Sequence, residues 1–362
     1  MCPQASLAGV EMGSRLGSLF RNAHLWLPGL VRDRWRRRRD CAPRVAWVTI
    51  ADHFEPLWGG ADLPTAMRRV GEWRRTWPEI AARHQDQEGR SPCYAFFYPQ
   101  EEYRPELVEQ LAEMTRLGIA EVEVHIHHDG DGEESFLDRM NGFVCTLRDE
   151  HGLLRLHEGR PAFAFIHGNW ALDNARPDGR WCGLNNEISL LRDLGCYADF
   201  TLPAAPEASQ AGPVNTIYRV LDDPQRPRSH ARGRPVVPGS PAWGDLTLIP
   251  GPLGLAWENR PWWKPRLETG EIAGYAMPTP ERARSWIALA PRIGDQAFIK
   301  LFGHGAQERN LHPLLGGGLD QLFDALDRAC REAGTALRYV SPWEMWRAVE
   351  SLRAGGSGHR ST

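Results

Sequence analysis

The sequence lacks a long uninterrupted apolar run. Its most apolar N-terminal stretch, residues 18–31 (SLFRNAHLWLPGLV), is broken by an arginine, a histidine and a proline, so it is too short and too polar to span a bilayer. The basic run WRRRRD at residues 35–40 follows that stretch, whereas a secretory signal places its positive charges first. We therefore expect residues 1–43 to form a basic arm outside the core. Weak contact with a membrane surface is the alternative.

The sequence also lacks paired cysteines and an excess of positive charge. Its seven cysteines are scattered, odd in number and never arranged as CxxC, which argues against a disulfide framework and against a thiolate zinc site. A net charge of -3 provides no broad basic field, so we expect no nucleic-acid partner. The cytoplasm, or a peripheral position at the inner membrane, is the expected location.

What is present is an alternation of strand-like and helix-like segments. Apolar, β-branched runs predict strands near residues 44–52, 93–99, 121–127, 161–167, 197–203, 245–251, 297–305 and 337–342. Apolar residues spaced three to four apart predict helices near residues 63–84, 105–118, 133–150, 185–194, 278–290, 319–334 and 343–352. Seven or eight such steps predict an α/β fold with a parallel sheet, most economically closed into a (β/α)7-8 barrel. We place this domain at residues 44–353, with a long irregular insertion at about 204–244 and a disordered tail at 354–362.

Reactive side chains fall at the predicted strand ends. Asp52, His125, His167 and His304 each lie at the C-terminal end of a strand or just past it. In a barrel these ends converge on one rim, so residues far apart in the chain are expected to surround one pocket.

The segment EVEVHIHHD, residues 121–129, predicts a metal site. If Val122 and Val124 pack on one face of the strand, then His125 and His127 share the other face with the glutamates. Two imidazoles at that spacing can reach one divalent ion, and Asp129 can add an oxygen ligand from the loop. Zinc is the favoured metal because the ligands are nitrogen-rich.

Two other strand ends carry polar groups suited to the same pocket. ADHFEP at residues 51–56 provides Asp52 as a carboxylate ligand, with His53 and Glu55 beside it, although an aspartate here also suits a turn cap. FGHG at residues 302–305 places His304 between glycines, where an accessible imidazole suits a general acid or a simple turn.

The segment FIHGNWALDN, residues 165–174, predicts carbohydrate binding. Hydrogen-bonding groups beside an indole plane are what a sugar requires, and a tight turn with a core tryptophan is the other interpretation. The candidate substrate-binding residues are His167, Asn169, Trp170 and Asp173.

Taken together, these motifs resemble the polysaccharide deacetylase family (carbohydrate esterase family 4), and more particularly an uncharacterised bacterial branch of it. The resemblance follows the strand order from Arg44 to Arg347 and implies a distorted β/α barrel that uses a divalent metal to remove acetyl groups from sugars. VTIAD is similar to the first motif of the family, in which a catalytic base precedes a metal-binding aspartate. This spacing gives Asp52 the metal role and places Ala51 at the base position. A shifted register instead makes Asp52 the base and His53 the ligand.

The resemblance extends to two more motifs. EVEVHIHHD is similar to the second motif, which implies His125 as a ligand together with His127 or Asp129. LFGHG looks like the last motif, which implies His304 as the general acid. The third and fourth motifs are not recognisable, and the substrate does not transfer from the family.

The expected function is a metal-dependent hydrolase that deacetylates a polysaccharide or amino sugar, with Asp52 as base and His304 as acid. One alternative is glycoside cleavage by paired carboxylates such as Glu55 and Asp173. The other is a catalytically silent carbohydrate-binding or biosynthesis protein that lost its base at Ala51.

Overall fold

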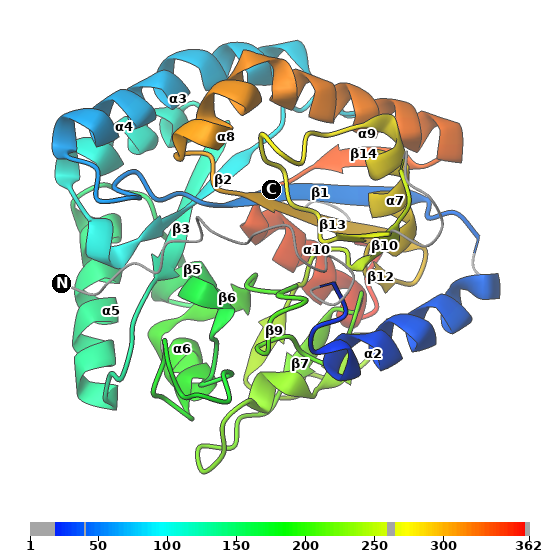
Figure 1. The fold of residues 1–362 in the computed structure, drawn as a ribbon, viewed down its shortest axis with the longest axis horizontal. Helices are drawn as coiled ribbons and strands as arrows, with labels where there is room; N and C mark the ends of the chain where they lie inside the picture. Colours follow the sequence, from blue (N-terminus) through cyan, green and yellow to red (C-terminus); the bar gives the residue numbers. More distant parts are fainter. Residues whose placement is uncertain (1–18, 40, 259–264, 359–362) are drawn as a thin grey trace.

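The computed structural model describes residues 19–39, 41–258 and 265–358 (Figure 1). The longer strands are β1 (Val45–His53), β2 (Tyr94–Pro99), β3 (Ala120–Ile126), β5 (Arg160–His167), β6 (Cys196–Asp199), β13 (Gln296–Gly303) and β14 (Ala336–Tyr339). The shorter strands are β4 (Arg155–His157), β7 (Tyr218–Val220), β8 (Arg234–Pro235), β9 (Leu246–Leu248), β10 (Gly254–Ala256), β11 (Arg266–Glu268) and β12 (Arg292–Ile293). The α-helices are α2 (Ala23–Arg36), α3 (Leu63–Arg83), α4 (Pro105–Arg116), α5 (Glu133–Asp149), α6 (Glu187–Leu194), α7 (Pro280–Leu289), α8 (Glu308–Pro313), α9 (Leu319–Ala333) and α10 (Pro342–Arg353).

A large, mostly parallel sheet organises the described residues. Its strand order is β12-β13-β1-β2-β3-β5-β6-β9-β7-β8, with β14 paired to β1 and β4 paired to β5. The pairs from β13 through β9 are parallel, and α-helices make most of the connections that parallel strands require, whereas β6 and β9 are joined through β7 and β8. The parallel strand ends therefore point the same way and bring the β1, β3, β5 and β13 termini to one edge.

The two faces of the sheet are buried in different ways. Val48 and Ile50 of β1 face the larger apolar cluster, which lies between the sheet and α3, α4, α5 and α9. Trp47 and Ala51 face a second cluster, which contains Phe298 and the inner side of α10. Since successive residues alternate between faces, the parity of a residue on β1 decides which cluster its side chain joins.

The α/β alternation expected from the sequence is confirmed. The strand β1 and the helix α3 lie within one or two residues of the expected bounds. The expected insertion is largely irregular, but it contributes β7 and β8, which extend the sheet by antiparallel pairing beyond β9. The tail expected at 354–362 is described only to Gly358, and Ser357 O accepts a hydrogen bond from Gln296 Nε2 at 3.0 Å. Residues 359–362 lie outside the described part of the chain.

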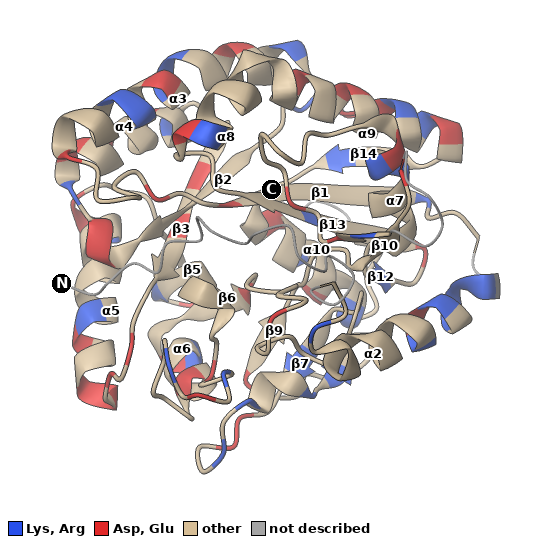
Figure 2. Cartoon of the chain, in the orientation of Figure 1, with Lys and Arg blue, Asp and Glu red and all other residues tan. Residues whose placement is uncertain are grey.

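The described part of the expected basic arm is a docked helix. Trp26 and Leu30 of α2 are buried in an apolar cluster with Ala205, Val214 and Leu253. Arg37 Nη2 donates to the carbonyl oxygen of Ala290 at 2.8 Å, so the basic end of α2 is also attached to the body. In Figure 2 the basic positions of α2 lie toward its C-terminal end, around Asp33, whereas α3 and α9 carry both signs along their length. Residues 1–18 and 40 of the arm lie outside the described residues.

No helix in the described part of the chain combines the length and the apolar character that crossing a bilayer requires.

Candidate metal centre

Four imidazoles from three strands meet on the face of the sheet that carries the second apolar cluster. On β3, Val122 and Val124 pack toward the helices, as the sequence predicted, so His125 takes the opposite face. On β1 the same parity places His53 there, with its ring centroid 5.1 Å from that of His125. His127 and His304 follow the ends of β3 and β13, where their rings lie beside these two.

Two of these histidines and one glutamate have the spacing of a metal-ligand set. Glu55 Oε1 lies 3.7 Å from His125 Nε2 and 3.4 Å from His127 Nε2. One ligand atom from each of these three residues lies within 4.8 Å of the other two. Two imidazoles and one carboxylate form a common ligand set for zinc and for other divalent metals. We refer to Glu55, His125 and His127 as the candidate centre.

Hydrogen bonds on the far side of each imidazole fix its orientation. His125 Nδ1 lies 2.8 Å from the carbonyl oxygen of Ile166, and this contact makes Nδ1 the protonated nitrogen. His127 Nδ1 lies 2.5 Å from Glu101 Oε1, whose carboxylate belongs to the short helix after β2. Metal-binding histidines have this arrangement, in which one nitrogen bonds a carbonyl or carboxylate and the other faces the ion. The Nε2 atoms of His125 and His127, which remain free to bind an ion, therefore both face Glu55.

The charges of the candidate centre favour a cation. Burial opposes ionisation of Glu55, but the neighbouring imidazoles outweigh it and lower its pKa to about 2. Burial also opposes protonation of His127, but the bond to the Glu101 carboxylate outweighs it and raises its pKa to about 9. The centre thus holds a carboxylate and attracts a positive charge, which a divalent ion would supply in place of the proton.

His53 and His304 flank the centre with nitrogens that have no partner. Their ring centroids are 4.9 Å apart. His53 Nε2, His125 Nε2 and His304 Nδ1 are buried without a hydrogen-bond partner. Burial lowers the pKa of His53, and the neighbouring imidazoles lower it further. Burial also lowers the pKa of His304, although the Glu55 and Glu271 carboxylates oppose the shift, so both rings are neutral near pH 7. Unpaired buried nitrogens are costly, and they indicate a ligand site.

Asp52, expected as metal ligand or base, lies away from the candidate centre. Its side chain has the parity of Ile50 and points toward the helices, opposite to His53. Both carboxylate oxygens lie 2.9 Å from Gly305 N, which donates to them. Burial raises the pKa of Asp52 to about 7, although the bond from Gly305 opposes the shift. The structure thus brings His53, rather than Asp52, beside His125.

Gly305 needs to be glycine because Asp52 approaches it so closely. A Cβ atom at Gly305 would lie 2.7 Å from Asp52 Oδ2 and 2.5 Å from Cζ2 of Trp73. The glycines of FGHG therefore allow the β13 terminus to approach β1 and α3. His304 itself is half-buried.

Asp129 is also outside the candidate centre. It is exposed, and its Oδ1 accepts a hydrogen bond from Trp181 N at 2.7 Å. Its carboxylate therefore anchors the segment after β5 instead of adding a third ligand to His125 and His127.

The four candidate substrate-binding residues divide between two places. Trp170 is half-buried and its ring centroid lies 6.3 Å from that of His53, so it borders the centre. Asn169 precedes it, partly exposed, with a positive φ of 53°. His167 and Asp173 are fully buried: His167 Nε2 lies 2.9 Å from His128 Nε2, and Asp173 Oδ2 accepts from Ser229 N.

A second group of ligand-type side chains surrounds His167. It consists of His128, His167, Cys182 and Glu187, all buried, and we refer to it as the buried cluster. Sequence reasoning missed His128, Cys182 and Glu187 as members of one site. It also missed Glu101, whose only signal is its position directly after β2.

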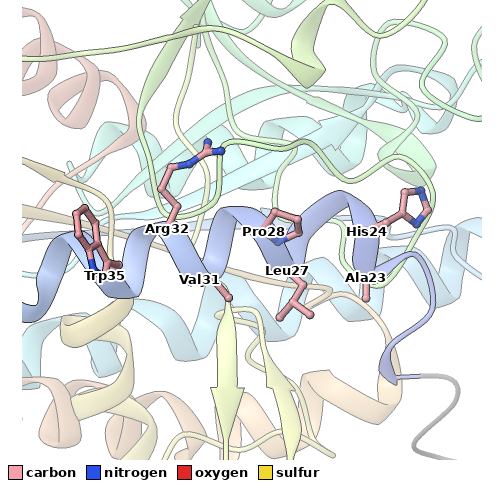
Figure 3. A pocket seen from close by; sticks show the side chains of 7 residues that line it. All are labelled: Ala23, His24, Leu27, Pro28, Val31, Arg32 and Trp35. Atoms are coloured by element: carbon pink, nitrogen blue, oxygen red, sulfur yellow. The ribbon is translucent and has the colours of Figure 1, made fainter.

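An apolar hollow lies far from these groups, on the outer face of α2. Figure 3 shows that the residues lining it all belong to this helix and its first turn: Ala23, His24, Leu27, Pro28, Val31, Arg32 and Trp35. Trp26 of the same helix is fully buried and packs in the apolar cluster with Leu30.

Neither a comparison with protein-family models nor a search of curated proteins finds a match for this chain.

Proposed function

We propose that this protein is a metal-dependent hydrolase that removes acetyl groups from a polysaccharide or amino sugar. The proposal includes a distorted β/α barrel of the polysaccharide deacetylase type, zinc as the metal and the cytoplasm as the compartment. The observation that supports it best is the set of unpaired buried nitrogens of His53, His125 and His304 around the Glu55 carboxylate. Such an arrangement suits metal-dependent hydrolysis, which uses a cation together with one side chain that accepts a proton and one that donates it.

His125, His127 and Glu55 would hold the ion, since these three offer nitrogen and oxygen atoms at ligand spacing. A bound zinc-class ion would activate water and polarise the acetyl carbonyl. Glu101 contributes by holding His127, because its carboxylate fixes which imidazole nitrogen faces the ion.

His53 and His304 are the proton-transfer groups in this proposal. A neutral imidazole accepts a proton at its free nitrogen, and burial makes the resulting imidazolium a ready donor. We assign His53 as the base and His304 as the acid that protonates the leaving nitrogen or oxygen. Asp52 then acts as a positioning residue, because its carboxylate holds Gly305 next to His304.

Trp170 supports a carbohydrate substrate. Its half-buried indole borders His53, so a sugar ring stacked on it would present a substituent to the candidate centre. Among the four residues expected to bind substrate, Trp170 and Asn169 keep this role in the proposal, while His167 and Asp173 are buried elsewhere.

Glycoside cleavage by Glu55 and Asp173 finds less support. Glu55 belongs to the candidate centre, whereas the Asp173 carboxylate is buried against Ser229 and its backbone nitrogen donates to Glu187. The two carboxylates belong to different clusters, and a glycosidase pair needs to flank one bond.

The test measures zinc content and acetate release from N-acetylated oligosaccharides in purified wild type and variants. We expect His125→Ala to lose the zinc of the candidate centre and the activity together. His53→Ala and His304→Ala should retain zinc and lose activity by roughly 10²- to 10⁴-fold, the usual contribution of a general acid or base. The matched control is His312→Ala, because this imidazole is 62% exposed and belongs to α8.

Three outcomes would count against the proposal. Unchanged acetate release in His125→Ala would remove the mechanism. Zinc binding without acetate release in the wild type would favour a silent binding protein. New reducing ends without acetate would favour a glycosidase.

A further inference from the structure

The buried cluster joins three segments that are distant in sequence. His128 follows β3, His167 ends β5, and Glu187 begins α6. Cys182 lies in the connection between β5 and α6, residues 168–186. The consecutive residues His127 and His128 point to different groups, because the first faces Glu55 while the second faces Glu187.

The ligand-type atoms of the buried cluster all lie within 4.8 Å of one another. His128 Nε2 is 2.9 Å from His167 Nε2 and 3.1 Å from Glu187 Oε1, and His167 Nε2 is 3.4 Å from the same oxygen. Cys182 Sγ lies 3.5 Å from the other carboxylate oxygen. Four ligands around zinc are separated by roughly 3.3 Å between nitrogens or oxygens and about 3.5 Å to sulfur. The observed spacing leaves room for one small cation.

The outer contact of His167 also suits a metal ligand. His167 Nδ1 lies 2.6 Å from the carbonyl oxygen of Gly168, which orients the ring so that Nε2 faces the cluster. His128 Nδ1 lies 3.3 Å from Asp131 Oδ2 but has no hydrogen-bond partner, and its Nε2 also faces the cluster. The Glu187 carboxylate is held as well, since its Oε2 accepts from Asp173 N at 2.6 Å.

Cys182 lies among backbone donors that would suit a metal-bound thiolate, although in this structure its thiol donates to Glu187 Oε2 at 3.5 Å. Its sulfur accepts hydrogen bonds from Asn174 N at 3.2 Å and from Leu184 N at 3.5 Å. A neutral thiol is a weak acceptor, whereas a metal-bound thiolate is stabilised by such backbone donors. A thiolate and the Glu187 carboxylate together carry the charge that a divalent ion neutralises, which removes the cost of burying either one alone.

From these contacts we infer a second metal site in the buried cluster, separate from the candidate centre, that holds one divalent ion of the zinc class. All four positions around the ion are filled by protein and all four residues are buried, so the site is structural. It fastens the 168–186 connection, in which Asn169, Trp170, Asp173, Asn174 and Trp181 have positive φ. Such backbone conformations are costly and persist only where other contacts fix them. The ion thereby holds Trp170 beside His53.

Cobalt(II) is the probe that separates the two sites, because only the buried cluster contains a cysteine. Cobalt-loaded wild type should show a thiolate charge-transfer absorption in the near ultraviolet, and Cys182→Ser should lack it. Cys330→Ser is the matched control, since that cysteine is also buried but lies in α9, and its spectrum should equal that of the wild type. His125→Ala should keep the band, which makes this result independent of the proposed function.

Zinc content provides the second measurement. Wild type should hold about two equivalents per chain and His125→Ala about one. Stripping zinc from the wild type with a chelator should expose Cys182 to alkylation and the 168–186 connection to protease, which tests the site even if Cys182→Ser fails to fold. A wild type without the thiolate band, or a Cys182 whose alkylation is unchanged by the chelator, would show that a proton and hydrogen bonds hold the cluster instead.

Discussion

Lys300 is a buried amine whose replacement should change the stability of the protein in a pH-dependent way. It lies on β13, its side chain is 1% exposed, and its Nζ donates to the carbonyl oxygen of Leu202 at 3.0 Å. Burial lowers its pKa from the ordinary value of 10.5 to about 7, although the charge of Asp199 opposes the shift. Removing the charge with Lys300→Met keeps the length of the side chain and replaces the amine with an apolar group.

The expected magnitude follows from the two pKa values. The pKa of Lys300 is about 3.5 lower in the folded chain than its ordinary value. Protonation of Lys300 therefore lowers the free energy of unfolding by roughly 5 kcal/mol. Between pH 7 and 10.5 the unfolded chain binds this proton and the folded chain does not, so the free energy of unfolding rises with pH in this window. Lys300→Met removes this dependence, but it leaves Leu202 O without its donor, which costs about 1–2 kcal/mol. We expect the variant to be more stable than wild type by about 3 kcal/mol at pH 6. Its stability should fall slightly below that of wild type near pH 10.

Urea unfolding followed by tryptophan fluorescence at pH 6 and near pH 10 would measure both values. Lys300→Arg is the control, because a guanidinium cannot release its proton in this range and should destabilise the protein at both pH values. Lys300→Met and wild type should differ in stability by different amounts at the two pH values. An equal difference at both would refute the proposed effect of the Lys300 charge.

Three further predictions concern the candidate centre and its surroundings. Gly168→Ala places a Cβ atom 2.3 Å from His127 Cδ2, so the imidazole ring must move. The zinc affinity, measured by chelator competition, should therefore fall. An unchanged zinc affinity would contradict this geometry. Glu101→Gln weakens the support of His127 and should lower zinc affinity by about 10- to 100-fold without unfolding the protein, as circular dichroism would verify. Burial, with Glu121 adding to it, raises the pKa of Glu123 from 4.5 to about 8, so the folded state holds its proton and stability falls as pH rises from 4.5 to 8. Glu123→Gln should flatten this decline in urea unfolding, and a decline as steep as that of wild type would refute the assignment.

Much of the architecture could be predicted because strands and helices leave local patterns. On β3, valines alternate with glutamates and histidines, and this pattern identified the face that carries His125 and His127 before any coordinates. The edge of the sheet where these side chains gather also followed from the direction of parallel strands.

The face of β1 could not be predicted in the same way. Every residue from Ala46 to His53 is buried, so apolar side chains point to both sides and the sequence does not show which parity meets β3. The resemblance of VTIAD to the first motif of the polysaccharide deacetylase family gave Asp52 the ligand role, whereas in the structure His53 and Glu55 face His125.

The buried cluster could not be predicted because its geometry depends on an irregular connection. Cys182 and Glu187 reach His128 only through a path with several left-handed residues, which no periodicity reveals. The absence of CxxC pointed away from a thiolate site, whereas the site that we infer combines a single cysteine with histidines and a glutamate.

The neighbouring imidazoles at the end of β3 limit how this protein can be altered. Inserting or deleting one residue just before His127 would move both rings out of register with their present partners. Both clusters would then be lost in a single step, even though every ligand-type residue would still be present. Changes to chain length in this region are therefore best made after Asp131, whereas side-chain replacement at residue 127 or 128 can alter one cluster and spare its neighbour.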